Sequence, residues 1–338
     1  MTRILLVFTG GTIGSQAENG NIDLNPDAGF KLLTLFSQQY PDAGQVSFKT
    51  LRPLQILSEN LHPADWQTLI AAIEAEDLAQ FDGIIVTHGT DTLAFSAAAL
   101  GLYFHQLQQP LLMVSSDLPL DNPNANGIAN FIAAVQFIRQ QISPGVFVPY
   151  QNPGQTLLIH QGTRLSQCLP LSSDFISVQS KPCFSYAEHQ FRQLLPLAVP
   201  PAPANRLQAS FSANILLIRP YPGLDYRRFN LHQVDAVLHD LYHSGTACSA
   251  SSHGEQHHLT PFIHHCRQQG IRLYLAPGLY SEEAYSSTRA LLHSGAEMIW
   301  NLSLESAYAK LLLAYGNFAD PASISSFLQT DLAGEHIV

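Results

Sequence analysis

The stretch that decides the fold is IIVTHGTDTL, residues 84–93, in which a run of apolar residues stops at a cluster of small polar ones. A similar change occurs in ILLVFTGGTIG, residues 4–14. Continuous apolar runs are typical of strands that are buried on both faces of a parallel sheet. In such sheets ligands bind outside the carboxyl ends of the strands. The two stretches therefore predict two buried strands, each ending in a Gly- and Thr-rich loop at a binding site.

The composition indicates a globular protein and argues against several kinds of partner. A length of 338 residues favours two domains, and 46% hydrophobic residues suffice for their cores. The net charge of −10, without a basic patch, argues against nucleic acid as a partner. No apolar run approaches the ~20 residues of a membrane span, and no CxxC pair suggests a disulfide framework. We expect a soluble, cytoplasmic protein that binds neither nucleic acid nor membrane.

The first part of the chain alternates between strand and helix patterns. RILLVF, GIIVT and PLLMVS are apolar strand candidates. A helix is expected to begin at Pro63, because proline suits the first helical position and apolar residues follow at helical spacing. A second helix is expected from Asp91 to about His105. This order predicts a larger N-terminal α/β domain, residues 1–193, with a mixed, mostly parallel sheet.

A proline-rich stretch interrupts this alternation. PLAVPPAPANRL cannot donate regular strand hydrogen bonds, so residues 194–209 are expected to form an extended linker. Strand and helix patterns then resume, with NILLIRP, DAVLH and IRLYLAP as strand candidates. Residues 210–338 are therefore expected to form a second, smaller α/β domain.

The two Gly- and Thr-rich loops carry the residue types that acyl transfer requires. Gly10 and Gly11 let backbone N–H groups approach a ligand closely. Thr90 and Asp91 are expected at the start of a helix, where unpaired N–H groups attract a carboxylate or an oxyanion. A threonine nucleophile, a second hydroxyl and a carboxylate together suggest covalent catalysis. The structural alternative is that these hydroxyls only cap helices.

TGGTIG followed by VTHGTDTL resembles the bacterial type of the L-asparaginase family, in its cytoplasmic type I branch. Weaker likenesses lie in LSENLHPADW, MVSSDLP, GTRLSQCLPLSSDFIS and SLESAYAKL. The resemblance implies a flavodoxin-like C-terminal domain and hydrolysis of asparagine to aspartate and ammonia through an acyl-threonine. It also implies a homodimer or homotetramer with active sites between subunits. The charged fraction of 12% favours assembly as well, because it leaves much apolar surface to cover.

The resemblance assigns roles to individual residues. Thr12 would be the nucleophile, and Thr90 and Asp91 would belong to a second catalytic group. The residues that it places around the substrate are Gly11, Ser58, Glu59, Gly89 and Ser116. Ser58 and the backbone around Glu59 and Gly89 would hold the α-carboxylate and α-amino groups of the substrate. No metal and no organic cofactor is implied.

One position departs from the family pattern in a way that bears on catalysis. Aligning GTRLSQCLPLSSDF by its arginine and its later Asp-Phe puts Gln167 where the family has a catalytic lysine. The chain has only four lysines, and Lys181 is the one that a shifted alignment would bring to this place. A neutral amide cannot act as a base, so we expect reduced activity. Glu59 also stands where a neutral residue is usual.

Several alternatives remain open at this point. The chain is either an amidohydrolase for asparagine, an amidase with another small amide substrate, or a weakened homologue that binds an amino acid as a sensor or scaffold. The histidine-rich stretch HGEQHHLTPFIHHC has His253 and His257 at a spacing that suits zinc, but we expect a surface loop and no metal.

Overall fold

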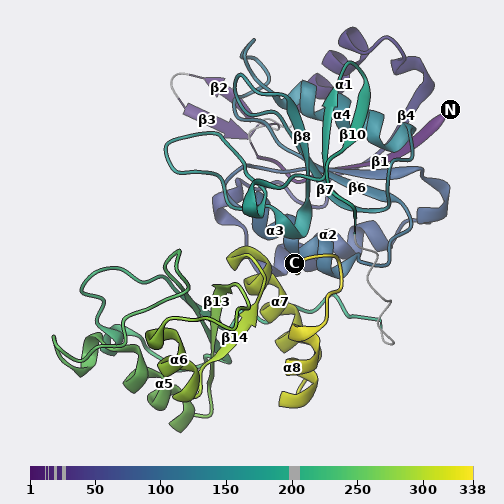
Figure 1. The fold of residues 1–338 in the computed structure, drawn as a ribbon. Helices are drawn as coiled ribbons and strands as arrows, with labels where there is room; N and C mark the ends of the chain where they lie inside the picture. Colours follow the sequence, from purple (N-terminus) through teal and green to yellow (C-terminus); the bar gives the residue numbers. More distant parts are fainter. Residues whose placement is uncertain (12, 14, 19–20, 25–27, 198–205, 338) are drawn as a thin grey trace. The chain divides into compact units, whose positions relative to one another are not determined.

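The computed structural model describes residues 1–338 except 12, 14, 19–20, 25–27, 198–205 and 338 (Figure 1). The chain divides into two compact units, Met1–Ala209 and Ser210–Val338. Each unit has its own sheet and its own core, so each is described by itself. Part of the proline-rich stretch, residues 198–205, lies outside the described residues.

The first unit is built on one eight-stranded sheet in the order β10-β9-β8-β7-β6-β5-β1-β4. The strands from β4 to β7 pair in parallel, whereas β7 to β10 pair antiparallel. Their bounds are β1 (Thr2–Phe8), β4 (Val46–Leu51), β5 (Gly83–Thr87), β6 (Pro110–Val114), β7 (Gly145–Tyr150), β8 (Leu157–Gln161), β9 (Phe184–Ala187) and β10 (Gln190–Gln193). A separate antiparallel hairpin joins β2 (Ser15–Glu18) to β3 (Asn21–Leu24).

Helices cover both faces of this sheet, which explains why its central strands are apolar throughout. Figure 1 shows α1 (Ala28–Gln39) and α4 (Gly127–Arg139) on one face, and α2 (Pro63–Glu74) and α3 (Leu93–Tyr103) on the other. All five residues of β5 are buried. The helix α2 begins at Pro63, as predicted. The indole Nε1 of Trp66 on this helix donates to Ser96 Oγ on α3 at 2.8 Å.

The second unit contains a four-stranded parallel sheet in the order β11-β12-β13-β14. Its strands and helices are β11 (Ile215–Ile218), β12 (Ala236–Asp240), α5 (Leu259–Gln268), β13 (Arg272–Gly278), α6 (Ser286–His293), β14 (Glu297–Trp300), α7 (Leu304–Asn317) and α8 (Pro321–Gln329). The Lys310 ammonium on α7 forms a fully buried ion pair with Glu335 at 2.6 Å, which holds the C-terminal segment to the helix. The predicted α/β fold, with a larger mixed sheet and a smaller second sheet, is confirmed.

Two negative findings hold for the part of the chain that the structure describes. No helix there is long and apolar enough to cross a membrane. No three His, Cys, Asp or Glu side chains lie close enough together to hold a metal ion. In the histidine-rich stretch, His257 Nδ1 instead contacts the carbonyl oxygen of Leu224 at 2.8 Å.

Candidate active site

The two Gly- and Thr-rich loops begin side by side. The strands β1 and β5 pair in parallel, with Phe8 opposite Thr87, so both loops leave the same edge of the sheet, as predicted. The Thr9 hydroxyl donates to the carbonyl oxygen of Thr87 at 2.6 Å, which fixes the start of one loop against the other. The nucleophile predicted from the sequence, Thr12, lies outside the described residues.

Gly11 brings the first loop into direct contact with the second. It has φ +77°, and a Cβ atom there would lie only 2.2 Å from the backbone nitrogen of Gly89. Real Cβ atoms do not approach another atom so closely, so only glycine fits this position. The Gly11 N–H donates to the carbonyl oxygen of Ile56 at 3.2 Å, which ties a third segment to the same place.

This third segment carries Ser58, which lies in a short 3-10 turn and is buried. The Ser58 hydroxyl donates to Asp91 Oδ2 at 3.2 Å, and the Thr92 hydroxyl donates to the Ser58 carbonyl at 2.9 Å. A Cβ atom on Gly89 would lie 2.4 Å from Ser58 Oγ. Ser58, Gly89 and Asp91 are therefore packed together at this edge of the sheet. The neighbouring Glu59 is exposed.

Thr90 and Asp91 precede the helix and do not cap it. The helix α3 begins at Leu93, two residues later than the sequence suggested, and its N-cap residue Thr92 makes no side-chain capping bond. The Thr92 hydroxyl is instead directed to Ser58. Thr90 is half-buried and Asp91 is exposed, so both side chains are accessible from one side. The alternative that the hydroxyls of this loop only cap the helix is therefore not supported, because the N-cap residue Thr92 makes no capping bond.

His88 stabilises the second loop as a neutral side chain. Its Nδ1 contacts the carbonyl oxygen of Gly89 at 2.8 Å, and because a carbonyl only accepts, Nδ1 carries the hydrogen. Burial lowers the pKa of the imidazole, against the opposing effects of the Gly89 hydrogen bond and the Asp91 charge. A buried, neutral donor of this kind orients the backbone that presents Thr90.

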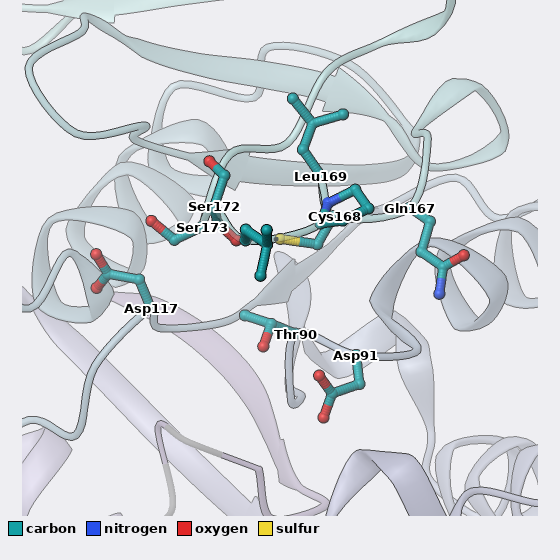
Figure 2. A pocket seen from close by; sticks show the side chains of 10 residues that line it. Thr90, Asp91, Asp117, Gln167, Cys168, Leu169, Ser172 and Ser173 are labelled. Carbon is teal, nitrogen blue, oxygen red and sulfur yellow. Dashed lines mark hydrogen bonds between the residues drawn. The ribbon is translucent and has the colours of Figure 1, made fainter.

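A cavity of ≈ 360 Å³ opens beside Thr90 and Asp91 (Figure 2). The segment of residues 167–173 forms the opposite wall, and Asp117 completes the lining. Hydrogen bonds at the base of this segment close it into a loop, since the Ser166 N–H donates to the Ile176 carbonyl at 3.0 Å. Gln167 is thereby placed in the same cavity as Thr90 and Asp91.

No lysine lines this cavity among the described residues, and each lysine side chain has another partner. Lys31 pairs with Asp121, Lys49 with Glu76, Lys181 with Gln179, and Lys310 with Glu335. Lys181, the alternative that a shifted alignment would offer, is exposed and donates to Gln179 Oε1 at 2.7 Å. Among the described residues, the cavity beside Thr90 therefore contains Gln167 and no lysine.

The segment after β6 contains Ser116, which the sequence suggested as a substrate-binding residue. Ser116 is fully buried and donates to the Leu118 carbonyl at 2.5 Å, and it is not among the residues that line the cavity. Asp117, which the motifs did not single out, lines it instead. The position of Asp117 in the sequence could have indicated this. It follows the end of β6, which pairs with β5, and ligands bind at the carboxyl ends of such strands.

The contact between Gly11 and Gly89 leads to a stability prediction. Gly11→Ala is expected to lower the free energy of unfolding by at least ~2 kcal/mol, because a left-handed backbone alone costs alanine about 1–2 kcal/mol and the clash adds to it. Urea denaturation followed by tryptophan fluorescence measures the change. Gly44→Ala is the matched control, since nothing lies within 4 Å of its added Cβ. Equal stability of the two variants would contradict the close approach.

Comparisons with known proteins show which families this chain is similar to. Among curated relatives, the chain is 28% identical to a glutamyl-tRNA(Gln) amidotransferase subunit from Haloquadratum walsbyi, over 98% of this chain and 75% of the relative. It is 25% identical to the protein of the same name from Saccharolobus solfataricus, over 99% and 76%. Among solved structures, the thermostable L-asparaginase from Thermococcus kodakarensis superposes with a TM-score of 0.80 at 23% identity, with both chains covered to 100%.

L-asparaginase I from Vibrio cholerae gives a TM-score of 0.78 at 23% identity, covering 100% of this chain and 99% of that structure. At such identities the solved structures establish a shared fold. The family model described as asparaginase, N-terminal, matches residues 3–193, which is more than half of the chain and contains every residue of the site described above. The chain therefore belongs to the asparaginase family.

Proposed function

We propose that this amidohydrolase-family chain hydrolyses L-asparagine to L-aspartate and ammonia through an acyl-threonine intermediate. The observation that supports the proposal most strongly is the packing of three segments at one edge of the sheet. Gly11 lies against Gly89, and the Ser58 hydroxyl lies 3.2 Å from the Asp91 carboxylate. The residue after Gly11 is Thr12, so this packing fixes the backbone next to the proposed nucleophile.

In the proposed reaction the Thr12 hydroxyl attacks the side-chain amide carbon. The amide nitrogen leaves as ammonia after taking up a proton, and water then hydrolyses the threonine ester. Ser58 and the backbone around Glu59 and Gly89 hold the α-carboxylate and α-amino groups of the substrate, whereas Asp91 belongs with Thr90 to the second catalytic group. Thr90 assists the proton transfers. No metal or organic cofactor takes part in this scheme.

Gln167 sets a limit on this chemistry. Its amide is able to donate a hydrogen bond to a group in the cavity, but it does not accept a proton at neutral pH. A positioned general base typically contributes about 10²–10⁴ in rate, so its loss predicts slow asparagine hydrolysis. We therefore propose a catalyst of reduced activity, with Thr90 deprotonated less readily than it would be beside a lysine.

Two other functions have support of their own. The curated relatives are named for a glutamyl-tRNA(Gln) amidotransferase, which favours an amidase that acts on an amide other than asparagine. Gln167 favours a weakened homologue that binds an amino acid without turnover. Ammonia release from asparagine, glutamine and simple amides separates the first alternative from our proposal. Calorimetric binding of asparagine without any ammonia release would favour the second.

We also propose that the protein is cytoplasmic and forms a homodimer or homotetramer. All four cysteines are free in the structure, which suits a reducing compartment. Exposed apolar side chains, among them Tyr280 at 69% and Tyr285 at 63% exposure, are consistent with further burial by a second copy.

The proposed nucleophile gives the first prediction about activity. Thr12→Ala is expected to abolish ammonia release, because it removes the hydroxyl that forms the ester. Thr34→Ala serves as the control, since Thr34 is exposed on α1 and its hydroxyl only donates to the Phe30 carbonyl. A coupled ammonia assay with asparagine measures both. Turnover that persists in Thr12→Ala would rule out the acyl-threonine mechanism.

The second prediction about activity concerns Gln167. Gln167→Lys is expected to raise kcat for asparagine by about 10-fold or more, because it supplies a base to the cavity that holds Thr90. Gln193→Lys, at an exposed position of β10, adds the same charge elsewhere and is expected to leave kcat unchanged. Steady-state ammonia release at saturating asparagine measures kcat. An unchanged kcat in Gln167→Lys would show that another group already acts as the base.

A further inference from the structure

The cavity beside Thr90 contains a second carboxylate, that of Asp117. Figure 2 shows Asp117 and Gln167 on opposite sides of Thr90. Two reciprocal bonds with Asn126 hold Asp117 in place, because its N–H donates to Asn126 Oδ1 at 2.9 Å and the Asn126 N–H donates to Asp117 Oδ1 at 3.0 Å. Asn126 is itself fixed, since its Nδ2 donates to the Gln151 carbonyl at 2.9 Å. The carboxylate is therefore positioned through one oxygen.

Asp91 is likewise bonded through one oxygen, since its Oδ2 accepts from Ser58. Within the described residues, hydrogen bonds reach Asp117 only at Oδ1, and no ion pair neutralises it. Its remaining oxygen is available to a group that enters the cavity. A carboxylate oxygen of this kind binds cations and N–H donors most strongly.

The charge of the whole cavity points to the same class of ligand. Asp91 and Asp117 contribute two negative charges, and no lysine or arginine is among the described residues that line it. Burial raises the pKa of the Cys168 thiol on the opposite wall, and the charges of Asp174 and Asp91 raise it further. An anionic group would be repelled by Asp91 and Asp117, whereas an ammonium would be attracted by both carboxylates.

The size of the cavity leaves room for more than a primary amide. Its volume of ≈ 360 Å³ is within the ~300–1,000 Å³ that small-molecule pockets typically have. An ammonia molecule leaving from beside Thr90 would occupy a small part of this space. A larger amine on the amide nitrogen would extend into it, toward the segment of residues 167–173.

We propose that Asp117 is a specificity-determining residue that selects amides whose amine portion carries a second, positively charged nitrogen. The substrates of this class are ω-amides of an acidic amino acid with a small diamine. The inference rests on the proposed function, because it uses the same nucleophile and the same cavity. Thr12 forms the ester as the C–N bond breaks, the diamine leaves after taking up a proton, and water releases the acid.

The test compares two amides of equal size, the β-amides of aspartate with ethylenediamine and with propylamine. Near neutral pH the amine portion of the first amide carries an ammonium, since an alkylamine has a pKa near ~10, whereas the propyl portion of the second amide carries no charge. Aspartate release gives kcat/KM for both. The wild-type protein is expected to prefer the charged amide by about 10- to 100-fold, the range of a hydrogen bond to a charged group.

Asp117→Asn is expected to reduce this preference to near parity, mainly through KM for the charged amide. The asparagine oxygen still accepts from the Asn126 N–H, so the loop keeps its geometry. Asp121→Asn is the matched control, because Asp121 lies nearby in the chain and pairs with Lys31. It is expected to keep the wild-type preference. A second measurement needs no variant, since rising ionic strength should weaken the wild-type preference.

The outcomes separate this inference from the proposed function. Hydrolysis of asparagine with equal or no hydrolysis of the two substituted amides would overturn the inference and leave the proposed function standing. A preference that survives in Asp117→Asn, or that does not respond to salt, would also overturn it. Absence of turnover with all three amides would contradict the proposed function and, with it, the inference.

Discussion

The close approach of two backbone segments, at Gly11 and Gly89, is the constraint on which the site depends. A side chain at Gly11 would lie 2.2 Å from the Gly89 nitrogen, so the loops after β1 and β5 meet only because both positions are glycine. The contact sets where the segment with Thr90 begins. Ser58 then completes the arrangement, because its hydroxyl reaches Asp91 and its carbonyl accepts from Thr92. Three segments that are distant in sequence thus form one rigid edge.

Much of this could be predicted from the sequence, for a physical reason. The strands β1 and β5 are buried on both faces, so their apolar runs are continuous and their ends are sharp. The loops that follow need glycine for their close approach, and the proposed chemistry needs their hydroxyls. The start of α3 was predicted two residues too early, because Thr92 bonds to Ser58 instead of capping the helix.

Other features could not be predicted, because they depend on contacts between distant segments. Nothing local to Asp117 shows that it faces a cavity whose other wall is formed by residues 167–173. Ser116 has the residue type of a binding group, yet its hydroxyl donates to the Leu118 carbonyl and it is not among the residues that line the cavity. The backbone after β6 determines that Asp117, and not the preceding Ser116, lines the cavity. A sequence motif does not show this.

The charge balance of the cavity follows from a global property of the chain. The sequence contains four lysines, and all of them are committed to partners outside the cavity. Gln167 therefore leaves Asp91 and Asp117 without a cation among the described lining residues. The proposed slow turnover and the proposed preference for a charged amine are two consequences of this one electrostatic condition.

The central claim is that this family member works through an ester on Thr12. Its most direct test is rapid acid quenching of the wild-type protein during asparagine turnover, followed by peptide mass spectrometry. The account predicts an aspartyl group on the peptide that contains Thr12, with fragmentation locating the group on that residue. Turnover without any acylated residue, or an acyl group found on Thr90 instead, would contradict it.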